Sequence, residues 1–343
     1  MKQMKKCIIV LLGLLIMAIA LTACTNGNEP TVAPEPAPEQ PAATPEPTPE
    51  APEPTPEPEL PPAERTRPTT DREGYAITLP DEINTILAIG PSNAEILVAM
   101  GLSHKIIAVD MFTADVPGLA SGISTELSIV GIDTEYVIEL MPDLVLITGM
   151  ARVGGEDPLQ AVSAAGISII YMPSSTSIQA IMEDIRFIAA VMETYEEGEA
   201  IISAMQAEID EITAIAATIT QARTVYFEIS PAIFGMFSFG HGTFLHEMIE
   251  LTGAVNIFED QHSWIPVSEE ALLEANPDVI LTSVDFIDDP IAEIMERPGF
   301  DTITAVQNGH VFTIDANSSN RPSQNITKAL REIAQAVFPE YFQ

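Results

Sequence analysis

The sequence predicts an α/β protein whose two lobes are joined by one long helix. Short apolar runs alternate with amphipathic helical segments over most of the chain, which is typical of parallel sheets covered by helices. One segment recurs in the second half of the chain, and an unbroken helical pattern separates the two series. We therefore expect a lobe at 74–194, a connecting helix at 195–220 and a second lobe at 221–343.

The alternation begins at 86–89, an apolar run that Gly90-Pro91 ends. Ser92 and Glu95 then match a capping box, so we expect a helix that starts with Ser92 as its N-cap and continues to Met100. The same reasoning, applied to the rest of the chain, gives the other elements. We expect strands at 106–109, 144–148, 167–172, 224–229, 279–282 and 310–314, and helices at 134–141, 158–165, 177–193, 243–251 and 323–337.

The segment between the lobes has the apolar spacing of one amphipathic helix. It contains no proline, and its apolar residues recur at intervals of three and four: Ile201, Ile202, Met205, Ile209, Ile212, Ile215 and Ile219. At ~1.5 Å per residue this helix would be long enough to connect two lobes as a strut.

A repeated segment relates the two lobes. Residues 134–146 align without gaps on residues 269–281, and each copy is read as a short helix, a Pro-Asp turn and a buried strand. The second and sixth positions are glutamate in both copies, and Pro142-Asp143 aligns with Pro277-Asp278. Any α/β chain reuses such turns, but this number of matches favours two related lobes.

The N-terminal residues 1–23 are interpreted as an export signal. Three lysines precede an apolar run that is short for a membrane span, and Leu21-Thr22-Ala23-Cys24 resembles the lipobox of bacterial lipoproteins. We expect Cys24 to be lipidated, and the mature protein to be extracytoplasmic and lipid-anchored to the cell membrane. The alternative is an ordinary signal peptide with an incidental Cys24. No cysteine follows Cys24, so the mature chain cannot form an internal disulfide.

Residues 24–73 are expected to form a disordered tether. Pro-Glu and Thr-Pro steps dominate this segment. Proline removes backbone donors and the glutamates repel one another, so no core can form there.

The charge of the chain excludes one class of partner. Its formal net charge is −36, with a pI near 4.1. A nucleic-acid binder must neutralise phosphates with clustered Lys and Arg, so we expect no nucleic-acid partner.

Several short motifs, in this order, resemble one family of transport proteins. They are Gly90-Pro91-Ser92-Asn93-Ala94-Glu95-Ile96-Leu97, Pro142-Asp143-Leu144-Val145-Leu146, Gly240-His241-Gly242-Thr243-Phe244-Leu245, Trp264-Ile265-Pro266-Val267-Ser268, Pro277-Asp278-Val279-Ile280-Leu281 and Asn320-Arg321-Pro322. Together they make the segment 75–340 similar to the substrate-binding component of an ABC importer, in the class that handles ferric siderophores, haem and cobalamin.

The resemblance implies two Rossmann-like lobes, a rigid connecting helix and a ligand cleft between the lobes. Ligands of open α/β sheets also bind beyond the carboxyl ends of the strands, which places the site in the loops at those ends. The expected ligand-binding residues are Pro91, Ser92, Asn93, Met111, Phe112, Arg152, Phe239, His241, Trp264 and Arg321.

Several of these residues have a plainer interpretation. Ser92 is expected to cap a helix in any case, and Trp264, the one tryptophan, could instead fill the core. Phe237 and Phe239 alternate as strand residues do, so one of them is expected in the core, and the sequence does not choose between them. His241 is either structural, a ligand contact or an axial ligand to haem iron or corrinoid cobalt.

Arg152 and Arg321 stand out because basic residues are scarce in this acidic chain. Their positions suggest a ligand with some anionic character. The family often continues Arg-Pro with a second arginine, where this chain has Ser323, and this difference weakens the case for a strongly anionic catecholate chelate.

Glu135 and Glu270 occupy equivalent positions of the repeat, each in the first turn of a helix. A favourable interaction with the helix dipole is one explanation. The resemblance implies another, in which matching glutamates on the two lobes dock onto arginines of the permease.

The sequence lacks the motifs of the main hydrolase and nucleotide-hydrolysing classes, so we expect no enzyme activity and no resident cofactor or metal. The expected function is capture of a metal chelate, with a ferric siderophore favoured over cobalamin or haem, and its delivery to an ABC permease and its ATPase. A lipid-anchored hydrolase is the alternative from another class. We expect the receptor to be a monomer.

Overall fold

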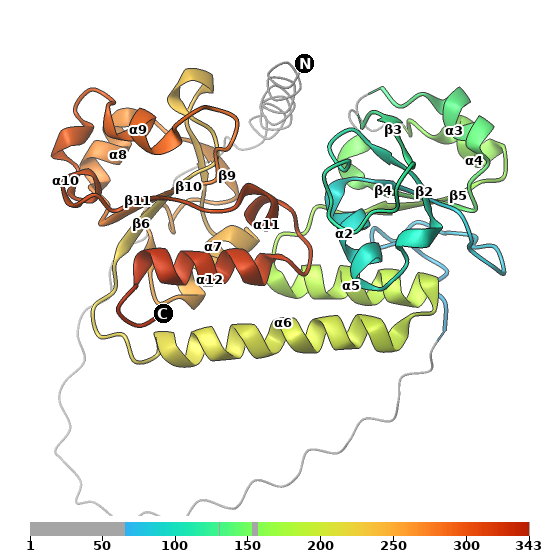
Figure 1. Cartoon of the computed structure of the whole chain (residues 1–343), viewed down its shortest axis with the longest axis horizontal. Helices are drawn as coiled ribbons and strands as arrows, with labels where there is room; N and C mark the ends of the chain where they lie inside the picture. Colours follow the sequence, from blue (N-terminus) through green and yellow to red (C-terminus); the bar gives the residue numbers. More distant parts are fainter. Residues whose placement is uncertain (1–65, 130, 153–156, 343) are drawn as a thin grey trace, which may run out of the picture.

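The computed structural model describes residues 66–129, 131–152 and 157–342. The expected signal peptide, Cys24 and the tether as far as residue 65 lie outside this range. The described residues form two α/β lobes side by side above one long helix, α6 (Tyr195–Ala216), as Figure 1 shows. No helix in the described part of the chain is both long and apolar enough to cross a membrane.

The N-terminal lobe contains a parallel sheet of five strands in the order β3-β2-β1-β4-β5. All four pairings are parallel, and the two central strands β1 and β4 are buried along almost their whole length. The strands are β1 (Ile86–Ile89), β2 (Ile106–Asp110), β3 (Ser124–Leu127), β4 (Leu144–Thr148) and β5 (Ser168–Met172). The sequence missed β3, because only Leu127 in this edge strand is buried and the apolar pattern is absent.

Helices cover both faces of this sheet, and two separate core clusters mark the two faces. The α-helices of this lobe are α2 (Pro91–Ala99), α3 (Thr134–Leu140), α4 (Gln160–Ala164) and α5 (Ile178–Met192), and each expected helix of the lobe is present.

The C-terminal lobe has a parallel sheet of four strands in the order β11-β10-β6-β8, and an antiparallel pair β7-β9. The strands are β6 (Thr224–Glu228), β7 (Phe237–Phe239), β8 (Val255–Asn256), β9 (Trp264–Pro266), β10 (Val279–Thr282) and β11 (Val311–Thr313). The helices are α7 (Phe244–Leu251), α8 (Glu269–Ala275), α9 (Pro290–Met295), α10 (Thr304–Asn308), α11 (Ala316–Asn320) and α12 (Ile326–Val337). The fold class predicted from the sequence, two lobes with parallel sheets, is confirmed.

Helix α6 is unbroken and packs against helices of both lobes. It contacts α5 of the N-terminal lobe and α7 and α12 of the C-terminal lobe, and its buried apolar residues are Ile202, Met205, Ile209 and Ile212. Gly198 allows the close approach of α5, since a Cβ there would lie 2.5 Å from the Cβ of Ala189. The helix ends at Ala216, and the Thr218 hydroxyl donates to the carbonyl of Ile215, 2.7 Å away.

The repeated segment has the same structure in both lobes. Helices α3 and α8 each end in a left-handed residue, Met141 at φ 44° and Asn276 at φ 45°. Asp143 then accepts hydrogen bonds from the backbone and hydroxyl of Thr85 at the start of β1. Asp278 makes the same bonds to Thr224 at the start of β6. The Pro-Asp turn therefore fixes the start of one central strand to the start of its neighbour in each lobe.

Two local expectations are wrong. The capping box at Ser92 does not form, because Gly90 at φ 101° is the N-cap and Pro91 occupies the first helical position. Ser92 therefore lies inside the helix, and Glu95 turns inward instead of back to the N-terminus. Residues 66–73, assigned to the tether, contact the N-terminal lobe: Arg67 donates to the carbonyl of Pro80 at 2.7 Å, and Arg72 pairs with Asp184 at 2.8 Å.

Candidate functional site

The carboxyl ends of strands in the two lobes lead into segments that contact each other. Glu95 lies on α2, which follows β1, and Asp115 lies in the turn after β2. Both carboxylates bind Arg321, which follows α11 at the carboxyl end of β11, with N–O distances of 3.1 Å to Glu95 and 2.8 Å to Asp115. The segments that follow β1, β2 and β11 therefore meet at the boundary between the lobes.

Glu95 is the centre of this inter-lobe contact. Its side chain is only 3% exposed, and its second carboxylate oxygen accepts from the Ser323 hydroxyl at 2.5 Å and from the Asn325 amide at 2.9 Å. Burying a carboxylate without such partners would be costly. We call Glu95, Asp115, Arg321, Ser323 and Asn325 the inter-lobe clamp. Arg321, expected to contact the ligand, is a member of this clamp.

A second contact joins the lobes through helix α5. Glu247 on α7 accepts a hydrogen bond from the backbone N–H of Ile178, the first residue of α5, at 2.7 Å. Ser177 caps the same helix end by accepting from Ala180 at 3.0 Å. A carboxylate of one lobe therefore satisfies a helix donor of the other, with favourable dipole alignment.

Arg152, the other arginine singled out from the sequence, is held within the N-terminal lobe. Its guanidinium lies 3.6 Å from the ring centre of Tyr171 and 4.5 Å from that of Tyr75, and it pairs with Glu73 at 2.8 Å. Burial, together with the hydrogen bond to Asp157, raises the pKa of the Tyr171 phenol, so this ring stays neutral beneath the arginine.

The residues around the β1 end are mainly structural. Asn93 is buried, and its amide donates to the carbonyl of Ile89 at 2.9 Å. Asp110, fully buried at the end of β2, accepts from the backbone of Gly90 and Phe112 at 2.7 and 2.8 Å. The half-buried side chains left at this rim are Pro91, Ser92, Met111 and Phe112.

The aromatic residues of the C-terminal lobe divide between core and surface. Phe239 is fully buried and packs against Phe227, so the expectation that it contacts a ligand is wrong. Phe237, its neighbour in the alternation, is half-buried. Trp264 is 40% exposed, which excludes the core alternative, and the buried Phe239 supports it edge-on at 6.0 Å.

His241 is exposed in the segment between β7 and α7. Its ring lies against that of His262, with the ring centres 5.1 Å apart. His241 is therefore not a core residue, and its Nδ1 lies 3.0 Å from the carbonyl oxygen of Glu259. His246, in contrast, is buried on α7 and contacts Glu250 at 3.4 Å.

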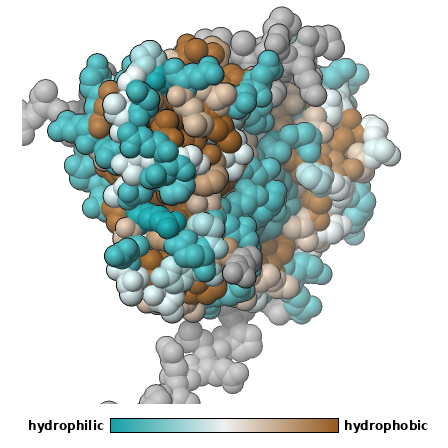
Figure 2. Space-filling view, turned by 60° about the vertical axis from the view of Figure 1, so that its left-hand side comes forward, coloured by the Kyte–Doolittle hydropathy of each residue, from teal (hydrophilic) through white to brown (hydrophobic). Residues whose placement is uncertain are grey.

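The sequence reasoning missed apolar side chains that the strand ends expose. Ile233, in the short helix after β6, is 67% exposed, and the half-buried Phe234 beside it packs against Phe286, which follows β10, at 6.0 Å. Met150, after β4, is 41% exposed. Extending the search of strand ends to the segment after β10, and further along the chain after β6, would have found Phe286, Ile233 and Phe234, whereas Met150 precedes the selected Arg152 in a segment already considered. Figure 2, with the C-terminal lobe forward, shows hydrophobic residues gathered on the upper part of that lobe and hydrophilic ones where it meets the other lobe.

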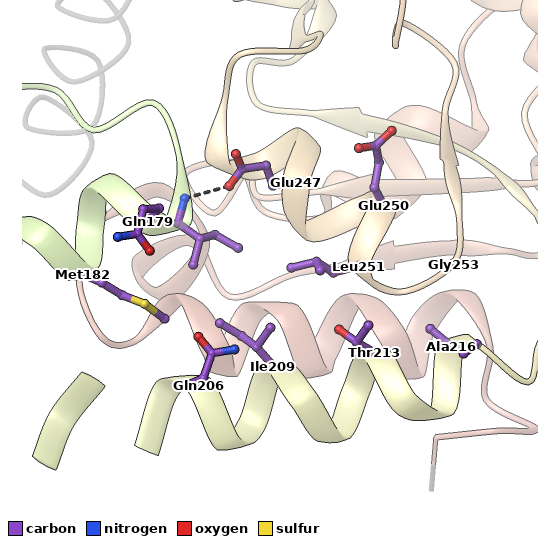
Figure 3. Close-up of a pocket in the computed structure, with 12 residues that line it drawn as sticks. Gln179, Met182, Gln206, Ile209, Thr213, Ala216, Glu247, Glu250, Leu251 and Gly253 are labelled. Atoms are coloured by element: carbon purple, nitrogen blue, oxygen red, sulfur yellow. Dashed lines mark hydrogen bonds between the residues drawn. The ribbon is translucent and has the colours of Figure 1, made fainter. Parts of the chain in front are cut away.

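A pocket of about 570 Å³ lies elsewhere, on the helical side of the molecule. Helices α5, α6 and α7 bound it, and Glu247, Met182 and Ile209 project into it (Figure 3). None of the ten residues expected to bind the ligand lines this pocket or the smaller one near Arg223. We therefore assign the candidate site to the exposed side chains at the strand ends of the two lobes.

Glu135 and Glu270 are both exposed in the first turns of α3 and α8. Their equivalent positions follow from the repeated segment, so each lobe presents one carboxylate on matching surface helices. This arrangement leaves them accessible to a partner.

Comparison with known proteins identifies the family. The family described as "Periplasmic binding protein" matches residues 86–318, which cover both lobes and α6. The chain belongs to the periplasmic binding protein family. This periplasmic binding protein is 26% identical, over 279 residues, to an uncharacterized ABC transporter substrate-binding lipoprotein of Bacillus subtilis, covering 80% of this chain and 86% of that one. It is 25% identical, over 281 residues, to a cobalamin-binding protein of Halobacterium salinarum, covering 78% and 72%.

Solved structures show the same fold. A possible iron-binding (periplasmic solute-binding) protein of Staphylococcus epidermidis superposes with a TM-score of 0.67 at 24% identity, covering 75% of this chain and 100% of that one. The periplasmic heme-binding protein RhuT of Roseiflexus superposes with a TM-score of 0.65 at 22% identity, covering 76% and 100%. The family consists of binding proteins, and the resemblance inferred from the sequence motifs is confirmed.

Proposed function

We propose that this periplasmic binding protein is the extracytoplasmic receptor of an ABC importer that captures an intact metal chelate, with a corrinoid as the favoured cargo. One observation carries the choice of cargo: carboxylates already pair with both arginines at the strand ends. Arg321 binds Glu95 and Asp115, and Arg152 binds Glu73.

Within the part of the chain that the structure describes, neither of these strand-end arginines is unpaired, which favours a large cargo that carries little negative charge. The exposed side chains that remain at the strand ends, such as Trp264, Ile233 and Met150, are apolar or aromatic. Such side chains suit the broad face of a macrocycle. A strongly anionic catecholate chelate would need unpaired arginines. The cobalamin-binding relative of Halobacterium salinarum supports the same choice.

Ferric siderophores, favoured by the sequence alone, and haem are the competing cargoes. Two structural neighbours are described as iron-binding and heme-binding proteins, so both of these cargoes should be tested beside cobalamin. Titration of the single Trp264 separates the cargoes, because its fluorescence reports directly on an occupied site. We expect cyanocobalamin to quench it saturably, and ferric hydroxamates, ferric catecholates and haemin to quench it more weakly. Tighter binding of a ferric siderophore would overturn the choice of cargo while leaving the receptor function in place.

Calorimetric titration of variants tests the site itself. Trp264→Ala should weaken cyanocobalamin binding, because it removes an exposed aromatic that the buried Phe239 holds in place. Tyr341→Ala is the matched control, since Tyr341 is 38% exposed near the C-terminus, away from the strand ends. If the two variants bound the cargo equally well, Trp264 would have no role in the site.

Delivery to a permease and its ATPase is proposed to use Glu135 and Glu270. Rim charges of this kind mainly set orientation and association rate. The double variant Glu135→Arg/Glu270→Arg should bind the cargo normally but fail to support uptake. The control Glu139→Arg/Glu274→Arg alters the other glutamate pair of the repeat. Unimpaired uptake by the first variant would remove the docking role.

Anchoring through a lipid on Cys24 is proposed from the sequence, and the lipoprotein relative of Bacillus subtilis supports it. Cys24→Ala should release the protein from the membrane fraction. Retention of that variant in the membrane would contradict the anchor. We further propose that the receptor acts as a monomer and carries no resident cofactor.

A further inference from the structure

Two exposed histidines of the C-terminal lobe form a pair that the proposed function does not use. His241 and His262 are partners in an isolated parallel bridge. The His241 N–H donates to the carbonyl of Gln261, and the Ser263 N–H donates to the carbonyl of His241, both at 2.9 Å. The backbone therefore fixes the two Cα atoms next to each other, and both side chains face solvent.

The spacing of the two rings suits one shared metal ion. Their centres are 5.1 Å apart and their planes meet at 75°. When two imidazoles bind one ion as neighbouring ligands with metal–nitrogen distances near ~2.0 Å, their ring centres lie roughly 4.5 to 5 Å apart, in square-planar as in tetrahedral coordination. The ring centres are thus already at the separation that coordination requires.

A backbone carbonyl sets the tautomer of His241. Its Nδ1 atom lies 3.0 Å from the carbonyl oxygen of Glu259. Because a carbonyl only accepts, Nδ1 is the donor of this hydrogen bond, and in the neutral ring Nε2 is then the nitrogen with the lone pair. Histidines that bind metals are commonly oriented by such a second hydrogen bond.

Gly242 makes room for the second ring. It adopts φ +80°, and a Cβ there would lie 3.1 Å from Nε2 of His262. A larger residue would be strained in this backbone conformation and would push the His262 ring away. The His262 nitrogen is therefore held next to the segment that carries His241.

The surroundings favour a cation. Glu259 and Asp260 are exposed in the turn that contacts His241, and the chain as a whole is strongly acidic. Within the described residues no group of three or more His, Cys, Asp or Glu side chains converges on one point. The pair would therefore supply two nitrogen ligands, and water would complete the coordination shell.

We propose that His241 and His262 form a binding site for a divalent transition-metal ion, with Cu²⁺ bound more tightly than Zn²⁺. Imidazole nitrogen suits these ions, and Cu²⁺ has the highest affinity among them for a given nitrogen site. The inference rests on the imidazole pair alone and holds whatever cargo the receptor carries.

Copper titration followed by electron paramagnetic resonance tests the site. The full chain should carry Cys7→Ser and Cys24→Ser, because these two thiols would bind copper themselves. We expect one equivalent of Cu²⁺ with nitrogen hyperfine structure from two imidazoles, and excess Mg²⁺ should not displace it. His241→Ala and His262→Ala should each weaken binding by about tenfold or more and remove one nitrogen from the spectrum.

The matched control replaces histidines away from the pair. His104 contacts the carbonyl of Gly101, and His310 stacks on Phe312, so His104→Ala/His310→Ala should leave copper binding unchanged. Three results would overturn the proposal: unchanged binding in both single variants of the pair, copper displaced by Mg²⁺, or a spectrum with oxygen ligands only. The last two would indicate binding to the acidic surface.

Discussion

Breaking the buried ion pair of the inter-lobe clamp, Arg321–Glu95, should lower the free energy of unfolding far more than breaking its exposed ion pair, Arg321–Asp115. Arg321 takes part in both ion pairs. One guanidinium nitrogen binds Glu95, whose side chain is 3% exposed, and another binds Asp115, whose side chain is 58% exposed. Arg321→Met keeps most of the volume and removes both bonds. Asp115→Asn weakens only the exposed one.

The expected magnitudes follow from burial. Removing one partner of a buried ion pair costs about 3–5 kcal/mol, because the other charge is left without its counter-ion. Glu95 would keep the donors Ser323 and Asn325, so we expect about 3 kcal/mol for Arg321→Met. An exposed pair is worth about 0.2–1 kcal/mol, so Asp115→Asn should cost less than about 1 kcal/mol.

Equilibrium urea unfolding measures both values, with far-UV circular dichroism reporting on both lobes and Trp264 fluorescence on the C-terminal one. Arg186→Met is the control, because Arg186 makes an ion pair with Glu199 in which both side chains are well exposed. Solution scattering should show that the lobes of Arg321→Met remain attached through α6. If Arg321→Met lowered the free energy of unfolding no more than Asp115→Asn or Arg186→Met, the buried pair with Glu95 would stabilise the protein no more than an exposed pair. The inference that burial makes the Arg321–Glu95 pair important would then be wrong.

Three further predictions concern stability. Gly198→Ala should lower the free energy of unfolding by about 1 kcal/mol, since overpacking against Ala189 outweighs the gain in helix propensity; a gain in thermal stability would contradict this. Met141→Asn, which copies Asn276 at the equivalent left-handed position, should raise the melting temperature, with a gain of about 0.5–1 kcal/mol. The hydrogen bonds donated by the backbone of Asn84 and Thr85 lower the pKa of Asp143 despite partial burial. The contribution of Asp143 to the free energy of unfolding is therefore fully present above the ordinary aspartate pKa of 3.8. It is lost as the pH falls through the lowered pKa of the folded state. The stability gap between wild type and Asp143→Asn should close in acid, and a gap independent of pH would refute this.

Most of the architecture could be predicted from the sequence, because it depends on local patterns. The apolar spacing of residues 195–220 specified α6, and the repeated Pro-Asp segments specified two similar lobes. The edge strands β3 and β8 escaped prediction, since an edge strand buries one face at most and shows little apolar pattern. The short strand β9 and the short helices α9, α10 and α11 also escaped, because three to six residues are too few to show a period.

The candidate site was predicted less well, because it depends on which side chains meet across the two lobes. Ser92 and Glu95 fit a capping box in sequence. In the structure Glu95 instead accepts a hydrogen bond from Arg321, which is distant in the chain and belongs to the other lobe. Phe237 and Phe239 are indistinguishable in sequence, and only the packing against Phe227 places Phe239 in the core.

The sequence by itself determined the α/β class, the connecting helix, the acidic charge and the family, because each of these follows from composition, periodicity or the order of motifs. Tertiary structure alone decided which arginines are already paired, which aromatics are exposed and which two histidines are neighbours. The physical reason is that burial and pairing depend on contacts between segments distant in the chain, and local spacing carries no record of them.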